Sequence, residues 1–287
     1  MMQRVSSSLR SVAGAAAIAP QNVLAASFSQ AAAPKPRGGT SSGSGAKIAG
    51  RSRFYKVVGI EPEGEGFCVT LDGKRVRTPA RSLLQLPTKS LAAAVAMEWD
   101  AQRETIQPST MPMMALASTA LDHWDFDFIH QELMKYLQTD TICFPVESQH
   151  QEKLAARQEK KWAPLRKWFE TEFGGELDVN HGSISKLQHD AQAVEKVGEF
   201  LQSIDHFELM AFRLIVRECK SMVVALALMK RHITAKEAIE LGRLEEEFQI
   251  ERWGLVEGGH DLDRANCSVS VHSASFFLWL LTERSKQ

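Results

Sequence analysis

The chain has 287 residues, enough for one large domain or two small ones, and its 44% hydrophobic and 24% charged residues are typical of a soluble globular protein. The formal net charge of −1 is unevenly distributed: the first sixty residues carry 8 of the 34 Lys and Arg and no acid, which leaves 26 bases against 35 acids, a net −9, from Glu61 onward. An acidic body of this kind argues against nucleic acid as a partner, because binding to nucleic acid depends on neutralising phosphates.

Residues 1–50 are predicted to be a mitochondrial transit peptide followed by a flexible linker. The opening segment is rich in Arg, Ser and Ala, and at helical spacing Val5, Leu9 and Val12 share a face that excludes Arg4 and Arg10. The linker, APKPRGGTSSGSGAK, is rich in Gly, Ser and Pro. A chloroplast address and a plain disordered tail are the alternatives, whereas a secretory signal fits less well because Gly and Pro interrupt the apolar stretch.

Residues 51–123 are predicted to form a small α+β domain that begins with an antiparallel β-meander. Three strand-like runs, RFYKVVGI, GFCVTL and KRVRTP, follow one another, and the second alternates in the manner of a half-buried strand. Asp72-Gly73 lies between the second and third runs and predicts a two-residue hairpin turn with positive φ. The run SLLQLP adds a short edge strand.

Two helices complete this domain. The first, LAAAVAMEWDAQRE, has Thr88 or Ser90 as its cap, and its apolar stripe is expected to pack on the meander. The stripe consists of Leu91, Val95, Trp99 and Ile106. The second, MPMMALASTALDHW, follows the break at Pro108.

Residues 124–287 are predicted to form an all-α domain. The run DFDFIHQELMKYLQ is amphipathic, and a long charged helix runs from Glu147 to Phe173, with Pro164 kinking or splitting it. GGELDVNHG is a loop, and SMVVALALM is a core helix too short to span a bilayer.

Two capping boxes mark further helix starts in this domain. Asp205 with Glu208 precedes FELMAFRLIVREC, and Thr234 with Glu237 precedes AKEAIELGRLEEEFQIERWG. The final apolar stretch, HSASFFLWLL, is expected to dock onto the helical body.

The sequence gives little sign of a metal site, a cofactor site or a disulfide bond. The four cysteines lie far apart with no CxxC pair, which fits reduced, buried thiols. The usual hydrolase, metalloprotease and nucleotide-binding motifs are absent. His260, Asp261 and Asp263 could hold a cation, but a polar turn or cap is the favoured interpretation. His123 and His130 are expected to be packing residues. We therefore predict no cofactor and no metal.

Glu98 and Asp100 are not a carboxylate pair, because residues two apart on a helix point about 200° away from each other. Asp100 is expected to face solvent, while Glu98 and Gln102 fall in the apolar stripe. A carboxylate placed there needs a partner, and a hydrogen-bonding link between helix and sheet is favoured. Candidate partners are Lys74, Arg75, Arg77 and Arg81. A general acid or base and a polar anchor for a partner protein are the alternatives.

Two segments are candidates for binding another protein. Met111, Met113 and Met114 lie in a Pro-rich segment, and although core packing is the default for methionine, such residues also line adaptable binding surfaces. The run LEEEFQIERWG is acidic and places a large aromatic residue near the end of its helix. A solvated face is its ordinary interpretation, and an interaction site is the alternative.

Several runs together resemble the mitochondrial ATP synthase assembly factor 2 family. They are RFYKVV, GFCVTLDGKRVRTP, EWDAQRETIQPSTMPM, WAPLRKWFETEFG and LEEEFQIERWG, in that order, and they span roughly Arg53 to Gly254. The combination of LDGK with TP, and of EWDAQ with the Met/Pro segment, is highly specific to this family.

The resemblance implies a chaperone that binds the newly imported α subunit of the ATP synthase catalytic head. It would shield the surface later covered by the β subunit and release α during assembly without hydrolysing ATP. It implies a protein of the mitochondrial matrix, with a peripheral location at the inner membrane as the alternative and no stable insertion in it, and we expect a monomer when the protein is free. The alternatives are a mitochondrial hydrolase that uses Glu98 and a matrix nucleic-acid-binding protein.

The family's motif positions correspond to two groups of residues here. The first is Glu98, Trp99, Asp100 and Gln102, and the second lies in the acidic helix. An acidic residue of this C-terminal region is functionally important in the family. The candidates for binding another protein are therefore the first group, the three methionines Met111, Met113 and Met114, and five residues of the acidic region. Those five are Glu245, Glu246, Gln249, Glu251 and Trp253.

Overall fold

The structure of this chain is a computed structural model that describes residues 48–122, 125–180, 187–256 and 258–282. These residues belong to one compact unit. The predicted transit peptide and most of the linker lie outside the described residues, as does His123. The division into two domains between residues 123 and 124 therefore stays a prediction, while the α+β fold class is confirmed by the elements described below.

A four-stranded antiparallel sheet opens the fold, as predicted. Its central strand is β2 (Gly66–Leu71), and β1 (Val58–Glu63) pairs with β2 along its whole length. The other edge of β2 is shared by two short strands, β3 (Lys74–Arg75) and β4 (Gln85–Leu86). Asp72 and Gly73 turn the chain between β2 and β3 with φ of 49° and 76°, the positive values that the sequence predicts.

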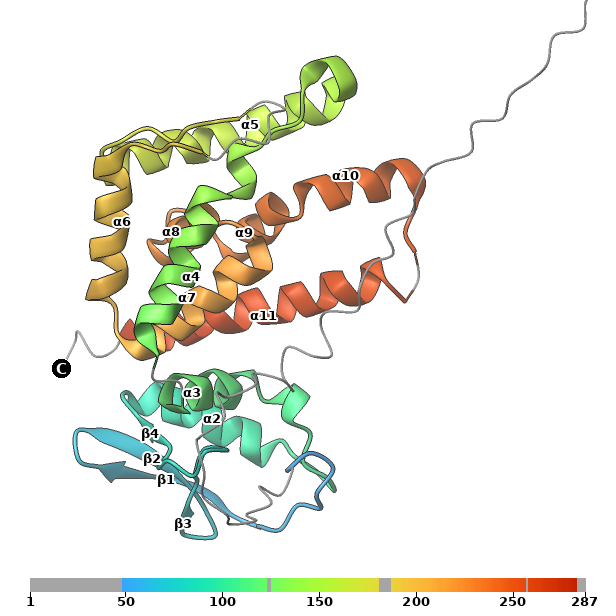
Figure 1. Cartoon of the computed structure of the whole chain (residues 1–287). Coiled ribbons are helices and arrows are strands. Elements are labelled where there is room, and N and C mark those ends of the chain that lie inside the picture. Colours follow the sequence, from blue (N-terminus) through green and yellow to red (C-terminus); the bar gives the residue numbers. More distant parts are fainter. Residues whose placement is uncertain (1–47, 123–124, 181–186, 257, 283–287) are drawn as a thin grey trace, which may run out of the picture. The chain divides into compact units, whose positions relative to one another are not determined.

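Helix α2 (Lys89–Asp100) packs its buried stripe against β1 and β2 (Figure 1). Thr88 is its cap, with a side chain that accepts a hydrogen bond from the backbone N–H of Leu91 at 3.1 Å. The helix ends at Asp100, earlier than predicted. Ile106 is nevertheless fully buried, because the chain turns back after the helix and pairs the backbone of Ile106 with that of Arg51.

The rest of the described chain is helical. After a short 3₁₀ turn, η1 (Pro108–Thr110), helix α3 (Pro112–Asp122) contacts α2 on one side and α7 and α11 on the other. The later elements are α4 (Phe126–Gln138), η2 (Thr141–Cys143), α5 (Ser148–Phe173), α6 (Ala191–Ser203), α7 (His206–Cys219), α8 (Met222–Met229), α9 (Ala235–Gly242), α10 (Leu244–Trp253) and α11 (His260–Leu281).

Helices α7 and α8 form the centre of this helical part. Seven of the eight residues of α8 are buried, as expected for a core helix, and α11 runs beside α7 and also contacts α3 and α9 (Figure 1). Both predicted capping boxes are present, at the starts of α7 and α9. The four cysteines are free and buried, as predicted.

Two predicted features of the long helices are wrong. In α5 the non-helical backbone angles lie at Gln151, and the helix continues through Pro164, where the buried side chains of Trp162 and Leu165 hold it against the core. The predicted single helix after Thr234 is split at Arg243 into α9 and α10, because the Arg243 guanidinium turns into the protein to meet carboxylates.

Gly242, the last residue of α9, lies against the backbone of α7. A Cβ at this position would be 2.9 Å from Cα of Cys219, a distance that would force one helix to move. We expect Gly242→Ala to lower the free energy of unfolding by about 1–3 kcal/mol, measured by urea unfolding.

The matched control for this variant is Gly198→Ala in the middle of α6, where an added Cβ meets no atom within 4 Å. Alanine should raise stability there by about 0.5–1 kcal/mol, because glycine is the poorer helix former. Equal effects of the two substitutions would contradict the close approach of α9 to α7.

Candidate protein-binding surface

Glu98 holds the start of helix α3. Its Oε1 accepts a hydrogen bond from the backbone N–H of Met113, and its Oε2 accepts one from Met114, each at 2.7 Å. The predicted partners in the meander were therefore wrong, as was the link from helix to sheet. The first N–H groups of a helix have no partner within the helix and lie at the positive end of its dipole. They therefore stabilise a carboxylate much as a Lys or Arg side chain would.

Gln102 completes the same joint between α2 and α3. Its amide nitrogen donates to the carbonyl of Glu98 at 3.0 Å and to Oγ1 of Thr110 at 3.1 Å, and its Oε1 accepts from the N–H of Gln107 at 2.7 Å. The side chain is buried, as predicted, although it lies beyond the end of the helix. Gln102 thus orders the segment that leads into α3.

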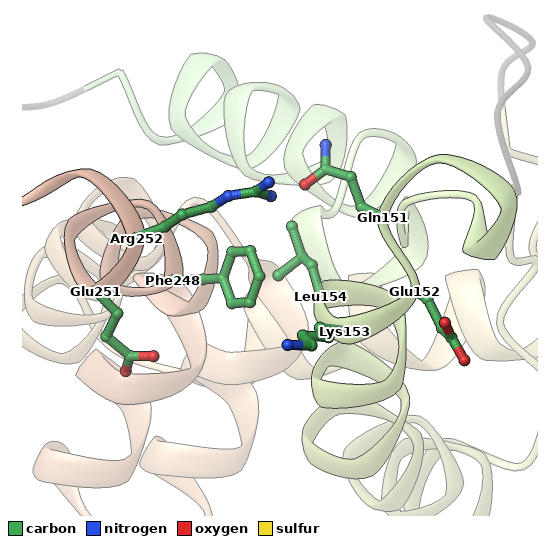
Figure 2. A pocket seen from close by; sticks show the side chains of 7 residues that line it. All are labelled: Gln151, Glu152, Lys153, Leu154, Phe248, Glu251 and Arg252. Atoms are coloured by element: carbon green, nitrogen blue, oxygen red, sulfur yellow. The ribbon is translucent and has the colours of Figure 1, made fainter.

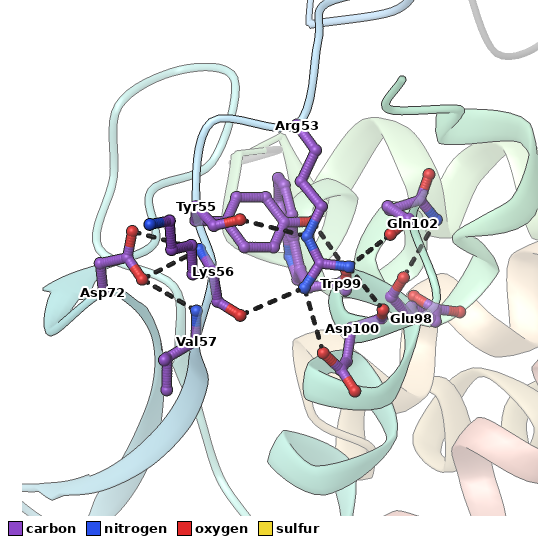
Figure 3. A network of polar contacts seen from close by, with 9 residues as sticks. All are labelled: Arg53, Tyr55, Lys56, Val57, Asp72, Glu98, Trp99, Asp100 and Gln102. Atoms are coloured by element: carbon purple, nitrogen blue, oxygen red, sulfur yellow. Dashed lines mark hydrogen bonds and ion pairs between the residues drawn. The ribbon is translucent and has the colours of Figure 1, made fainter. Parts of the chain in front are cut away.

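Trp99 and Asp100 attach the chain before β1 to the end of α2 (Figure 3). Trp99 is buried and packs edge-on against Tyr55, whose hydroxyl donates to the Trp99 carbonyl at 2.6 Å. The Asp100 side chain is exposed, as predicted, and pairs with Arg53 at 3.2 Å. The EWDAQ run is therefore a structural joint, and both acceptor atoms of Glu98 are already occupied by backbone groups.

The methionines of the Met/Pro segment lie mainly in the core. Met111 and Met113 are buried, and Met114 is half-buried against the same core. Core packing, the default for methionine, describes their position. A role in binding stays a prediction for these residues, and other side chains make the exposed apolar surface.

The carboxylates of the acidic helix α10 pair with other side chains of the same chain. Its apolar attachment is small, because Leu244 is its one buried residue and Phe248 packs at the edge of the core. Polar partners hold the rest of the helix. Glu245 accepts a hydrogen bond from Gln158, Glu246 from Lys220, Glu247 from Arg264 and Glu251 from Arg157. Glu246 also forms an ion pair with Arg243.

Arg243 is the buried centre of this charge network. Its guanidinium pairs with Glu246 at 2.9 Å and with Asp263 in the first turn of α11, so it ties α10 to α11. Asp263, one of the three residues that could hold a cation, therefore pairs with the guanidinium of Arg243. No group of three or more potential metal ligands occurs among the described residues.

A hollow of about 460 Å³ lies between α10 and the start of α5 (Figure 2). Phe248 from α10 and Leu154 from α5 point toward one another in it, and polar side chains surround them. Those side chains are Gln151, Glu152, Lys153, Glu251 and Arg252. Glu98, the residue that a hydrolase would use, is not part of this lining.

Apolar side chains are exposed where α10 ends. Trp253 is 70% exposed, and Leu255 and Val256 follow it on the surface. Gly254 ends the helix with φ of 90°, so the predicted helix end with a surface tryptophan is confirmed. The guanidinium of Arg252 lies 5.5 Å from the centre of the Trp253 ring. These three apolar residues are here named the α10 end.

Comparison with known proteins agrees with this architecture. A family model described as "ATP12 chaperone protein" matches residues 52–170. The crystal structure of Atp12 from Paracoccus denitrificans has a TM-score of 0.74 and 33% sequence identity, over 80% of this chain and 98% of that chain. The chain belongs to the ATP12 chaperone family. It is thus a chaperone of ATP synthase assembly, as the resemblance in its sequence implies.

Two fungal members of the ATP12 family are mitochondrial proteins. Protein atp12 of Schizosaccharomyces pombe is 27% identical over 234 residues, which are 78% of this chain and 80% of that protein. Protein ATP12 of Saccharomyces cerevisiae is 22% identical over 268 residues, which are 78% of this chain and 82% of that protein. The predicted mitochondrial location is confirmed, and none of the described helices is long and apolar enough to cross a membrane.

Sequence reasoning missed one surface of this ATP12 family member. The final apolar stretch was expected to dock onto the body, and one face of α11 does so, but Val269, Phe276 and Trp279 on another face are about half exposed. The signal was present in the sequence, because α11 is apolar on more sides than a single contact needs.

Glu98 makes stability depend on pH. Burial raises its pKa to about 7, against the lowering effect of the two backbone hydrogen bonds. The folded state therefore keeps a proton that the unfolded state, with a pKa of about 4.5, has lost. The contribution of Glu98 to stability falls as pH rises from about 4.5 to about 7.

We expect the difference in unfolding free energy between the wild type and Glu98→Gln to shrink as pH rises from about 5 to about 7.5, because glutamine has no proton to lose. Urea unfolding followed by circular dichroism at several pH values measures this difference. Asp100→Asn, at an exposed carboxylate, is the control. A difference that stays constant or grows as pH rises would show that folding does not raise the pKa of Glu98.

Proposed function

We propose that this chain binds the unassembled α subunit of the ATP synthase catalytic head and covers its β-facing surface until assembly. Membership in the ATP12 chaperone family supports the general role. The choice of the α subunit rests on the resemblance carried by LDGK, EWDAQ and the Met/Pro segment.

The observation that carries the proposal is the exposure of the α10 end. A subunit that normally sits in a ring leaves a large apolar interface uncovered when it is alone, and such surfaces aggregate. A chaperone for it needs exposed apolar groups of its own. Trp253 is exposed and lies beside Arg252. Tryptophan and arginine are among the residue types most enriched at strongly binding positions of interfaces.

The acidic residues of α10 serve this surface indirectly. Because Glu245, Glu246 and Glu251 are paired with side chains outside α10, they hold α10 in place so that its end is presented to a partner. Charge reversal at Glu246 would set a lysine against Lys220 and Arg243, and it would loosen the helix as well as alter its charge. Trp253 offers a cleaner test.

We expect co-expression with this chain to keep the α subunit soluble and bound, and to leave the β subunit unaffected. Trp253→Ser should weaken α binding roughly thirty-fold, the loss typical of a strongly binding interface residue. Pull-down of tagged chain and titration of purified α subunit measure the two effects.

Met97→Ser is the matched control, because Met97 is equally exposed, at 71%, but lies on α2. It should bind α normally. Equal binding to both subunits, or to neither, would contradict the proposed function. Equal loss in the two variants would remove the α10 end from it.

A further inference from the structure

Helix α11 has an outer face that is apolar, regularly spaced and uncovered by any other described element. Four large side chains, 47–58% exposed, follow one another along it at Leu262, Val269, Phe276 and Trp279. Ala265 and His272 lie between them and are also exposed. These six residues are here named the outer stripe.

The spacing of the outer stripe is that of a helix-pairing seam. Its members follow one another by steps of three, four, three, four and three, the a/d pattern by which two helices interlock side chains. The opposite face of α11 already packs on the body through residues such as Val271, Ala274 and Phe277. A helix that is apolar on both faces is normally covered on both.

The outer stripe is long enough for another helix to pack along it, and its side chains differ in size along its length. At 1.5 Å per residue, the 22 residues of α11 extend about 33 Å. The stacked rings of Phe276 and Trp279, with centroids 5.8 Å apart, form a broad end. Ala265 and Val269, whose side chains are smaller than these rings, lie between Leu262 and the broad end.

The distribution of charged residues along α11 limits the kind of partner that the outer stripe can bind. No Asp, Glu, Lys or Arg occurs between Ala265 and Thr282. At the start of the helix Asp263 and Arg264 are paired with Arg243 and Glu247, while Asp261, next to Leu262, is exposed. From Ala265 onward the neighbouring residues of α11 are uncharged, which fits a neutral, apolar helix face. This pattern does not fit a membrane surface, since helices that lie on membranes carry Lys and Arg beside their apolar face.

His272 gives the stripe one polar position. Its Nδ1 lies 2.8 Å from the carbonyl oxygen of Ser268, which can only accept, so Nδ1 is the donor in this bond. In the neutral ring, Nε2 is then an acceptor within the stripe. A single polar group in an apolar seam fixes the register of the incoming helix, which must place a donor opposite it.

A second copy of the chain is the poorer occupant. Antiparallel pairing of two outer stripes would match residues 262 with 279, 265 with 276 and 269 with 272. It would bring the two copies of His272 close together around the twofold axis, each an acceptor facing apolar Val269 with no donor to meet it. The stripe satisfies its polar position better with a different helix.

We propose that the outer stripe docks an amphipathic helix of the unassembled ATP synthase subunit, one with a neutral apolar face and a hydrogen-bond donor opposite His272. This inference rests on the proposed function and extends the α10 end into a longer surface. The two are adjacent, because the carbonyl of Val256 accepts hydrogen bonds from the N–H groups of Gly259 and His260 at the start of α11.

The test uses the full chain with Val269→Ser and Phe276→Ser combined. Both side chains are about half exposed, so the thermal unfolding midpoint should stay close to that of the wild type. The affinity for purified α subunit should fall at least tenfold, while Met97→Ser binds normally. Unchanged affinity in the double variant, with the wild type binding well, overturns the inference and leaves the proposed function intact. Failure of the wild type to bind α overturns the proposed function itself.

A photo-crosslinking residue at position 269 provides a second measurement that does not depend on the stability of the double variant. We expect it to join α subunit through one helical segment. Crosslinks spread over strands and loops overturn the docking of a helix.

Two further measurements exclude the other occupants. Light scattering of the free protein should give a monomer. A dimer that the double variant converts to monomer would assign the stripe to a second copy. Binding of the wild type, but not of the double variant, to vesicles of neutral and anionic phospholipid would assign it to a membrane. Either result overturns the proposal.

Discussion

Helix α3 begins with backbone N–H groups that need acceptors, and the carboxylate of Glu98 in α2 accepts two of them. Much of the architecture depends on this contact, because α2 packs on the sheet while α3 packs on α7 and α11. Gln102 fixes the connection between the two helices. A second link, from the Thr88 hydroxyl to the carbonyl of Leu280 at 3.0 Å, joins the start of α2 to the end of α11. Sheet and helices are thus held together by buried polar contacts within an apolar core.

Helix α10 is attached in a different way. It buries little apolar surface, and its glutamates pair with side chains of α5 and α11 and with Lys220, which follows α7, around the buried Arg243. Ion pairs at a surface stabilise only modestly one by one, but a network that shares a buried guanidinium has a defined geometry. The arrangement holds a short helix away from the core with an exposed tryptophan at its end, which an apolar contact of this size could not do.

The packing of the helices also explains where the exposed apolar groups lie. Helices α7 and α8 and the inner face of α11 supply many of the buried apolar side chains, whereas the outer face of α11 and the α10 end stay exposed. Scattered apolar side chains are normal on any protein surface, but a regular row of them along one helix is not. For a member of a chaperone family, a lasting apolar surface is a requirement of function, and the uncharged border of α11 keeps it apolar over most of its length.

Local physical chemistry determined much of this protein from its sequence alone. Turn geometry at Asp72-Gly73, the capping boxes, the core helix α8 and the order of strands and helices depend on neighbours within a few residues, and the family motifs lie in continuous runs. Only the tertiary structure decided which groups meet across the chain. Arg157 lies 94 residues from Glu251, and Glu98 found backbone N–H groups where the sequence had offered only charged side chains as partners. The two faces of α11 are similarly apolar in the sequence, and which of them stays uncovered depends on how the other helices pack.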